Sequence, residues 1–220
     1  MSNYQTYNQG NQAWGNKVMS PGSLTLAKAG CLVTALSSGI SNFTYNLDPG
    51  QLCDKLVTGG AFMPSSDLSW SAFERCFPQL AVAERDSTTA LKINHDANPV
   101  EIETALDRCK RLAGYGQVVV LNVDHLWDDG IADHWVLLVD DKWNIMDPDG
   151  GLVIPFSERY GDPRTGIKGF AFVVGTPGWF LDGTSKEEAD RWVAIGETVL
   201  LMRKYPNDPV VKRLFDGLTR

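Results

Sequence analysis

The sequence predicts an α+β protein in which a group of helices precedes an antiparallel sheet. Helix start signals and helical apolar spacing dominate as far as residue 112, whereas residues 117–175 hold short runs of β-branched residues separated by polar turns. From about residue 180 the apolar spacing is helical again. We therefore expect one main domain over residues 1–178 and a C-terminal helical extension over residues 179–220.

The expected helices are recognised by their start signals and their apolar stripes. A glycine followed by Cys31 opens a run with apolar residues at i, i+4 and i+8, and Asp48-Pro49 begins a capping-box pattern. The polar residues 1–28 show little periodicity, and their aromatic residues indicate that this segment lies on the domain surface from residue 7 onward. One predicted helix begins at Cys31, and three others cover residues 48–59, 67–77 and 98–112.

The expected strands are short and rich in β-branched residues. They cover residues 117–124, 134–140, 143–146, 152–155 and 170–175. The first two are expected to be neighbours, and a hairpin is expected to join the strand that begins at His134 to the next one. In the extension, a capping box at residues 185–188 predicts a helix to about residue 205, and Asn207-Asp208-Pro209 opens a last short helix.

Composition argues against several classes of function. The chain has 220 residues and a net charge of −7, which argues against sequence-independent nucleic-acid binding and against docking on an anionic membrane. No apolar run approaches the roughly 20 residues of a membrane span, and the N-terminus lacks the features of a classical signal peptide. The four cysteines show no CxxC pair and no metal-like spacing with the three histidines, so we expect reduced thiols and no metal or other cofactor.

Cys31 is the candidate nucleophile. Its sulfur is expected at a helix N-terminus, where unpaired N–H groups and the positive end of the helix dipole favour thiolate over thiol. Taken alone, a cysteine at a helix start is usually a small buried apolar residue, so the assignment depends on other segments. The remaining three cysteines fall on helical patterns and are expected to pack in the core.

Three polar residues supply what thiol chemistry needs besides the nucleophile. His134 opens a strand and Asp147 follows the next one, so a hairpin would bring the carboxylate beside the imidazole. Gln9 lies 22 residues before the cysteine, and its amide can donate to an oxyanion. Simpler interpretations stay open: His134 as a core histidine, Asp147 as a turn former and Gln9 as a loop residue, with Gln12 as an alternative donor.

These residues also carry a family resemblance. The order of glutamine, cysteine helix, histidine strand and aspartate after the next strand resembles papain-like cysteine peptidases. More narrowly, YNQGNQAWGN at residues 7–16, AGCLVTAL at 29–36, DHWVLL at 133–138 and IMDP at 145–148 resemble motifs of the bacteriocin-processing (double-glycine) peptidase-like family. The resemblance covers about residues 5–175. Asn11, Gln12 and Ala35 depart from the usual aspartate, proline and serine, and none of these departures removes a catalytic group.

The resemblance implies a papain-like fold and a thiol mechanism. Cys31 would be the nucleophile and its backbone N–H part of the oxyanion hole, with His134 as general base and then acid. Asp147 would orient the imidazole and stabilise its cation, and Gln9 would be the second oxyanion donor. Many similar proteins are encoded by bacteria and their phages. The implied function is a cysteine peptidase or amidase acting on a peptide or a peptidoglycan cross-link, either cytoplasmic or associated with a phage virion.

Two other functions remain open from the sequence. The chain would be a structural protein of a virion or another assembly if its C-terminal helices dock into partner proteins through Trp179, Phe180, Trp192 and Phe215. A thioester resolved by an amine rather than by water would make the protein an acyltransferase. An acidic cluster near His134 is either a solvated loop or a feature that favours cationic substrate groups; its members are Asp124, Asp128, Asp129 and Asp133.

Overall fold

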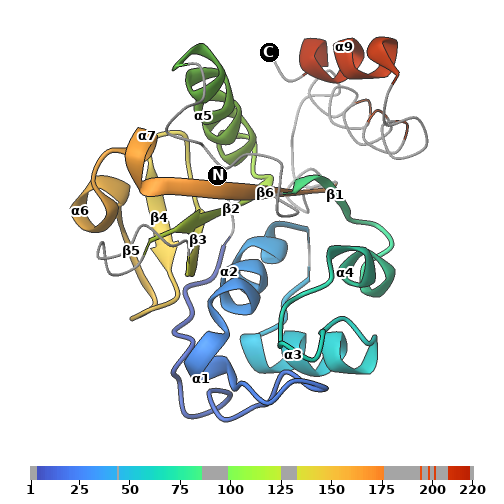
Figure 1. Ribbon diagram of the computed structural model, residues 1–220, viewed down its shortest axis with the longest axis vertical. Helices are drawn as coiled ribbons and strands as arrows, with labels where there is room; N and C mark the ends of the chain where they lie inside the picture. The colour runs from blue at the N-terminus through green and yellow to red at the C-terminus, as the bar shows by residue number, and fades with distance from the viewer. Residues whose placement is uncertain are drawn as a thin grey trace.

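A computed structural model of the protein describes residues 4–43, 45–85, 99–124, 133–175 and 208–218, together with residues 194, 198 and 201. These residues form an α+β fold with an antiparallel sheet of six strands and helices on both of its faces (Figure 1). The expected fold class is confirmed at this level. Most of the predicted helix over 185–205 and the predicted domain boundary at 178 and 179 lie outside the described residues.

The four helices expected before the sheet are all present, and so is the last short helix. Before α3, the Asp48 carboxylate accepts from the Gln51 N–H at 2.8 Å, and the Gln51 side chain accepts from the Asp48 N–H at 3.0 Å, which completes the predicted capping box. The described helices are α1 (Leu26–Ala29), α2 (Cys31–Ile40), the 3₁₀ turn η1 (Ser41–Phe43), α3 (Pro49–Thr58), α4 (Trp70–Cys76), α5 (Pro99–Gly114), α6 (Phe156–Tyr160), α7 (Pro163–Gly166) and α9 (Pro209–Leu218).

Two helix ends differ from the prediction. α4 begins at Trp70 rather than at residue 67, because Phe62 and Leu68 form a β-bridge that holds this stretch extended. α5 continues to Gly114, past its predicted end at residue 112. The helical hydrogen-bond pattern persists there, because the Tyr115 N–H donates to the Arg111 carbonyl oxygen, four residues earlier, at 3.0 Å. The sequence does not predict α1, α6 and α7, which have only four or five residues and therefore show no periodicity.

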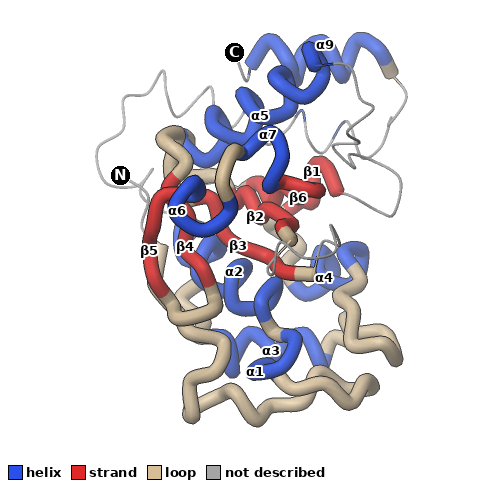
Figure 2. The backbone as a smooth tube through the Cα atoms, turned by 60° about the vertical axis from the view of Figure 1, so that its left-hand side comes forward, coloured by secondary structure: helices blue, strands red, loops and turns tan. Residues whose placement is uncertain are grey.

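The six strands pair in the order β1-β6-β2-β3-β4-β5, and every neighbouring pair is antiparallel. They are β1 (Ala81–Arg85), β2 (Val118–Val123), β3 (His134–Leu138), β4 (Asn144–Asp147), β5 (Leu152–Pro155) and β6 (Ile167–Val174). The five predicted strands are present, and β2 and β3 are neighbours as expected. The sequence does not predict β1, and β6 does not continue from β5 but lies between β1 and β2 (Figure 2).

Alternating side chains of the central strands build two hydrophobic cores, one on each face of the sheet. In the first core, Val118 and Val120 of β2 pack with residues of α2, α3 and α4. In the second core, Val119 and Leu121 of β2 pack with residues of α5 and α6. Helices α1 to α4 lie on one side of the sheet and α5 lies on the other (Figure 1). The central strands are therefore buried on both faces.

α2 packs directly against β2 and β3. All of its residues except Leu32 are buried. Gly39 permits this close approach, because a Cβ atom there would lie 2.7 Å from Val118 Cγ1 and 3.0 Å from Leu137 Cδ1. The position of α2 against the sheet in turn fixes the position of Cys31, its first residue.

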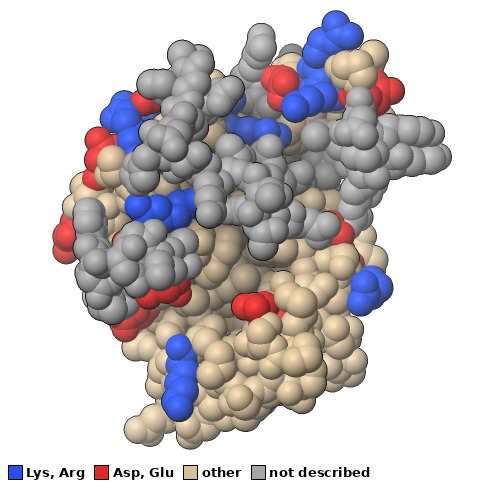
Figure 3. Space-filling view, viewed as in Figure 1, with Lys and Arg blue, Asp and Glu red and all other residues tan. Residues whose placement is uncertain are grey.

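The described part of the C-terminal extension contacts the second core. Phe215 of α9 is fully buried, and the guanidinium carbon of Arg108 in α5 lies 4.8 Å from the centre of its ring. None of the described helices is both long and apolar enough to cross a membrane. On the face drawn in Figure 3, the Lys and Arg side chains of the described residues are scattered rather than gathered into one basic patch.

The four cysteines all carry free thiols. Cys53 and Cys109 are buried, as expected for core packing, whereas Cys76 is only partly buried. Burial, together with the charge of Asp54, raises the pKa of the Cys53 thiol to about 11. Cys53 is therefore suited to core packing and not to thiolate chemistry.

Candidate active site

Cys31 is the first residue of α2, where the sequence predicts the nucleophile. The chain turns so tightly before Cys31 that Gly30 has no room for a side chain: a Cβ atom there would lie 2.5 Å from the Leu26 carbonyl oxygen. Thr34 N–H donates to Gly30 O at 2.9 Å in the first turn, so the Cys31 N–H is one of the N-terminal donors without a partner inside the helix. A sulfur and an N–H donor thus lie together at the positive end of a ten-residue helix.

His134 and Asp147 form a buried pair on the predicted hairpin. His134 is the first residue of β3, Asp147 is the last residue of β4, and these strands are antiparallel neighbours. His134 Nε2 lies 2.8 Å from Asp147 Oδ1, and the two side chains are exposed by only 7% and 0%. The imidazole also hydrogen-bonds to Cys31. The structure therefore joins three of the four predicted site residues in one chain of contacts.

Two residues that the sequence analysis misses hold the Asp147 carboxylate from the other side. Arg159 Nη1 and the Tyr160 hydroxyl both donate to Asp147 Oδ2, at 2.9 and 2.7 Å. Arg159 also donates to the backbone and side-chain oxygens of Asp149. Both residues lie on α6, whose five residues show no sequence periodicity. The only available signal is an arginine that follows the hairpin after the DPDGG turn.

The irregular N-terminal segment brings Gln9 to the same site. The Gln9 backbone N–H donates to Pro148 O at 3.0 Å, and Trp14 anchors the segment against the first core. The side-chain Nε2 of Gln9 donates to Ala27 O at 3.3 Å, while its Oε1 is shielded from solvent and has no hydrogen-bond partner among the described residues. Gln9 lines the cavity that contains Cys31, whereas the alternative, Gln12, is exposed and does not.

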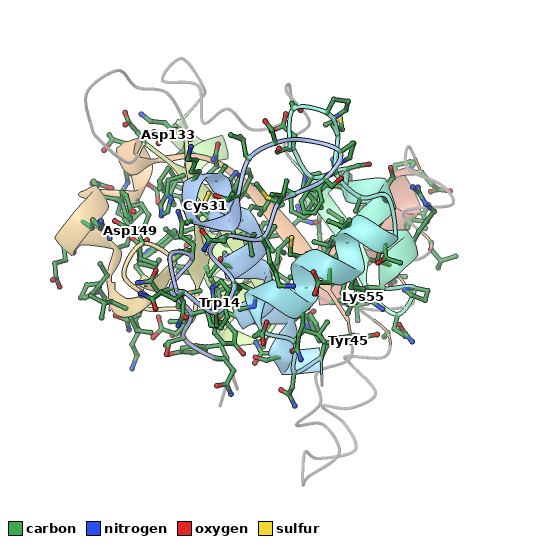
Figure 4. All side chains as sticks on the ribbon, turned by 90° about the horizontal axis from the view of Figure 1, so that it is seen from below. Trp14, Cys31, Tyr45, Lys55, Asp133 and Asp149 are labelled. Carbon is green, nitrogen blue, oxygen red and sulfur yellow. The ribbon has the colours of Figure 1, made fainter. Side chains whose placement is uncertain are left out.

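A cavity of about 530 Å³ opens at Cys31 and His134. In Figure 4, Cys31, Asp133 and Asp149 lie together on one side of the molecule, away from Tyr45 and Lys55. Of the predicted acidic cluster, Asp133 lines the cavity, Asp124 does not, and Asp128 and Asp129 lie outside the described residues. The apolar wall consists of Met19, Leu32, Val33, Phe62, Leu68 and Trp135, and the polar wall of Gln9, Lys28, Ser66, Asp67, Asp133 and Asp149.

The pairing of His134 sets the electrostatics of the site. Burial alone lowers the pKa of the imidazole, but hydrogen bonds to Asp147 and Cys31 and the negative charges of both raise it to about 9. Burial raises the pKa of Asp147, but the bonds from His134 and Tyr160 outweigh this effect and lower it. Burial and the bond to Asp147 raise the pKa of Tyr160, so its hydroxyl stays protonated and donates. The arrangement favours an imidazolium on His134 beside an ionised Asp147 carboxylate.

Comparisons of the chain with protein-family models, with curated proteins and with solved structures find no match. Among the described residues, no group of three or more His, Cys, Asp and Glu side chains is arranged to hold a metal ion. The chemistry that the side chains of the site offer is nucleophilic attack by a thiolate, with an adjacent imidazole to move the proton.

Proposed function

We propose that the protein is a papain-like cysteine peptidase or amidase that hydrolyses a peptide or peptidoglycan cross-link amide through a thioester on Cys31. The observation that carries the proposal is the contact chain from Cys31 to His134 to Asp147, which opens into a cavity. A cysteine at the start of a helix, packed on an antiparallel sheet that carries the histidine and the aspartate on neighbouring strands, supports the papain-like arrangement.

Acylation begins from the ion pair of Cys31 and His134. The Cys31 Sγ attacks the amide carbonyl carbon, and the electron pair of the C=O bond moves to the oxygen. The Cys31 N–H donates to this oxyanion, and the second N–H of the Gln9 amide is the other donor. The His134 proton moves to the leaving nitrogen as the C–N bond breaks, which gives a free amine and a thioester.

Deacylation uses the neutral imidazole as a base. His134 takes a proton from water as the water oxygen attacks the thioester carbonyl, and a second oxyanion forms in the same place. When this intermediate collapses, the C–S bond breaks, the product leaves as a carboxylic acid, and Cys31 returns to its thiolate paired with imidazolium. Throughout the cycle Asp147 holds the ring by Nε2 and stabilises its cation.

The walls of the cavity fit a peptide-like substrate with an amino group. Its volume of about 530 Å³ lies in the usual range for ligand sites, and it combines apolar walls with hydrogen-bonding groups. On the polar wall, Asp67 and Asp133 outnumber Lys28, while the charge of Asp149 is shared with Arg159. This excess of negative charge favours cationic groups such as lysine or diamino-acid side chains, which occur in peptidoglycan cross-links.

The test is a search for Cys31-dependent cleavage with isotope-labelled water. The wild type, Cys31→Ala and the control Cys76→Ala are incubated in H₂¹⁸O with peptide mixtures and with muropeptides from digested peptidoglycan. Wild type and Cys76→Ala are expected to give products with one ¹⁸O in each new carboxyl group, and Cys31→Ala none. Acid-quenched wild type should also show a protein mass increased by the acyl group. Cleavage that persists in Cys31→Ala, or no cleavage by the wild type, contradicts the proposal.

A role in an assembly is the second candidate function, and one observation favours it. Of the residues predicted to dock, Phe215 is fully buried in the protein's own core and is not available to a partner, and Trp179, Phe180 and Trp192 lie outside the described residues. Val210 and Leu214, however, lie one turn apart on the same helix, α9, and are exposed by 63% and 50%. An exposed pair of this kind suits contact with another protein. Replacing both residues by serine should abolish assembly and spare cleavage if α9 docks, whereas an unchanged assembly state contradicts this role.

A further inference from the structure

The carboxylate of Asp147 has more partners than the orientation of an imidazole requires. His134 Nε2 and the Asp149 backbone N–H contact Oδ1 at 2.8 and 2.9 Å, and Tyr160 and Arg159 donate to Oδ2 at 2.7 and 2.9 Å. The Asp147 side chain is fully buried, whereas that of Arg159 is 32% exposed. A cation at the edge of the protein therefore reaches a buried anion whose other oxygen faces the histidine.

The charged groups around His134 come from separate elements and balance in pairs. Cys31 on α2 contacts His134 on β3, and Asp147 on β4 faces Arg159 on α6. In the proposed mechanism the first pair is a thiolate and an imidazolium. Asp149, in the turn after β4, shares the guanidinium through its own carboxylate. The Asp149 side chain is 52% exposed, so solvent screens its charge more than that of Asp147.

This balance changes when the thioester forms. The Cys31 charge is then consumed and His134 has given its proton to the leaving amine, so neither carries a charge. Without Arg159, Asp147 would then be a buried carboxylate that keeps its hydrogen bonds but faces no positive charge, which is unfavourable. It would then bind the imidazole proton more tightly and resist its transfer to the leaving nitrogen.

We propose that Arg159 is a positioning residue that keeps Asp147 ionised and aimed at His134 while the imidazole gives up and regains its proton. This inference rests on the proposed function for its role in turnover. Arginine suits the task because its planar fork makes several bonds in fixed directions. Nη1 contacts both Asp147 Oδ2 and Asp149 O, and Nη2 contacts the Asp149 carboxylate.

The test follows the protonation of His134 without any substrate. In a Cys31→Ala background, which removes the coupled thiol, ¹⁵N-histidine NMR measures the pH midpoint of the imidazole. The chain has only three histidines, and loss of one signal in a His134→Gln protein assigns the resonance. The variants are Arg159→Met and Arg159→Gln, which both remove the charge while the second keeps a donor. The control is Arg164→Met, since Arg164 pairs with Glu103 on the surface and its side chain is 58% exposed.

Both Arg159 variants are expected to raise the His134 midpoint by about one pH unit, because a cation near the pair is lost, and Arg164→Met is expected to leave it unchanged. On the Cys31 protein, Arg159→Gln should lower kcat more than it changes KM and move the alkaline limb of the rate profile upward. A midpoint that stays constant in both Arg159 variants, or that moves equally in Arg164→Met, overturns the inference. A raised midpoint in a protein that cleaves no amide overturns the proposed function instead.

Discussion

Replacing His134 by glutamine removes the imidazole and keeps a side chain of similar size at the start of β3. The replacement tests whether this residue activates Cys31, and it needs no knowledge of the substrate. In the wild type the pKa of His134 is about 9, so the imidazolium is almost fully populated at pH 6.5 and can pair with a thiolate. In the variant no such partner remains.

The expected effect follows from the thiolate population. An ordinary cysteine thiol has a pKa near 8.5, so only about 1% of it is thiolate at pH 6.5, which allows a loss of up to about 100-fold. A thiolate that is less stabilised is a better nucleophile, and this difference raises the alkylation rate of the variant about tenfold. Alkylation of Cys31 should therefore slow by about tenfold at pH 6.5, whereas near pH 9, where most of the variant's thiol is ionised, the variant should react at least as fast as the wild type.

The assay is limited alkylation with iodoacetamide, followed by mass-spectrometric mapping of each cysteine. Cys76 is partly exposed and serves as the internal reference, and the buried Cys53 and Cys109 should react little in the folded protein. Equal rates at Cys31 in wild type and variant at pH 6.5 would refute the assignment of His134 as its base. Equal labelling of Cys31 and Cys76 in the wild type would refute an activated thiolate and favour the assembly role.

Three further results are expected. Gln9→Ala should lower kcat by about 100- to 1000-fold through loss of an oxyanion donor, whereas Gln12→Ala should keep activity, as steady-state kinetics will measure. Pairing raises the pKa of His134 from 6.5 to about 9, so protonated His134 contributes on the order of 3 kcal/mol to folding stability. This contribution is complete below pH 6.5 and is lost as the pH rises to 9. Urea unfolding at pH 6 and pH 9.5 measures the loss of stability, and His134→Gln should abolish it. Gly39→Ala should destabilise the protein by about 1 to 2 kcal/mol, because its Cβ would lie 2.7 Å from Val118, and a lower urea midpoint at constant m-value would show it.

Local signals predict most of the fold, and the unpredicted parts depend on distant pairing. The capping box before α3 and the β-branched runs of β2 and β3 specify their own conformations. β1 has no such signal, and it is a strand because it pairs with β6, a distant segment of the chain, with Ala81 opposite Val174. The place of β6 between β1 and β2 likewise depends on which strand edges remain available after β2 to β5 have paired.

The same distinction holds for the candidate site. His134 and Asp147 can be paired from the sequence, because a hairpin joins their strands and its geometry is local. Arg159 reaches Asp147 only because α6 packs against β5 and brings its last residues to the end of β4, which no spacing in the sequence reveals. The side-chain partner of Gln9, the Ala27 carbonyl, depends in the same way on how the N-terminal segment crosses α1.

The site also depends on both cores at once. His134 pairs with Val123 and stacks on Tyr160, with ring centres 6.5 Å apart, so its ring belongs to the face of the sheet covered by α5 and α6. Cys31 belongs to α2 on the opposite face. The two meet only because each is the first residue of its element, so that the contact passes around the end of the sheet. A shift of α2 against the sheet would separate them without unfolding either layer.

Gly39→Ala should therefore slow alkylation of Cys31 although it touches no polar group of the site. Gly217→Ala in α9, where an added Cβ meets nothing within 4 Å, should leave the alkylation rate unchanged.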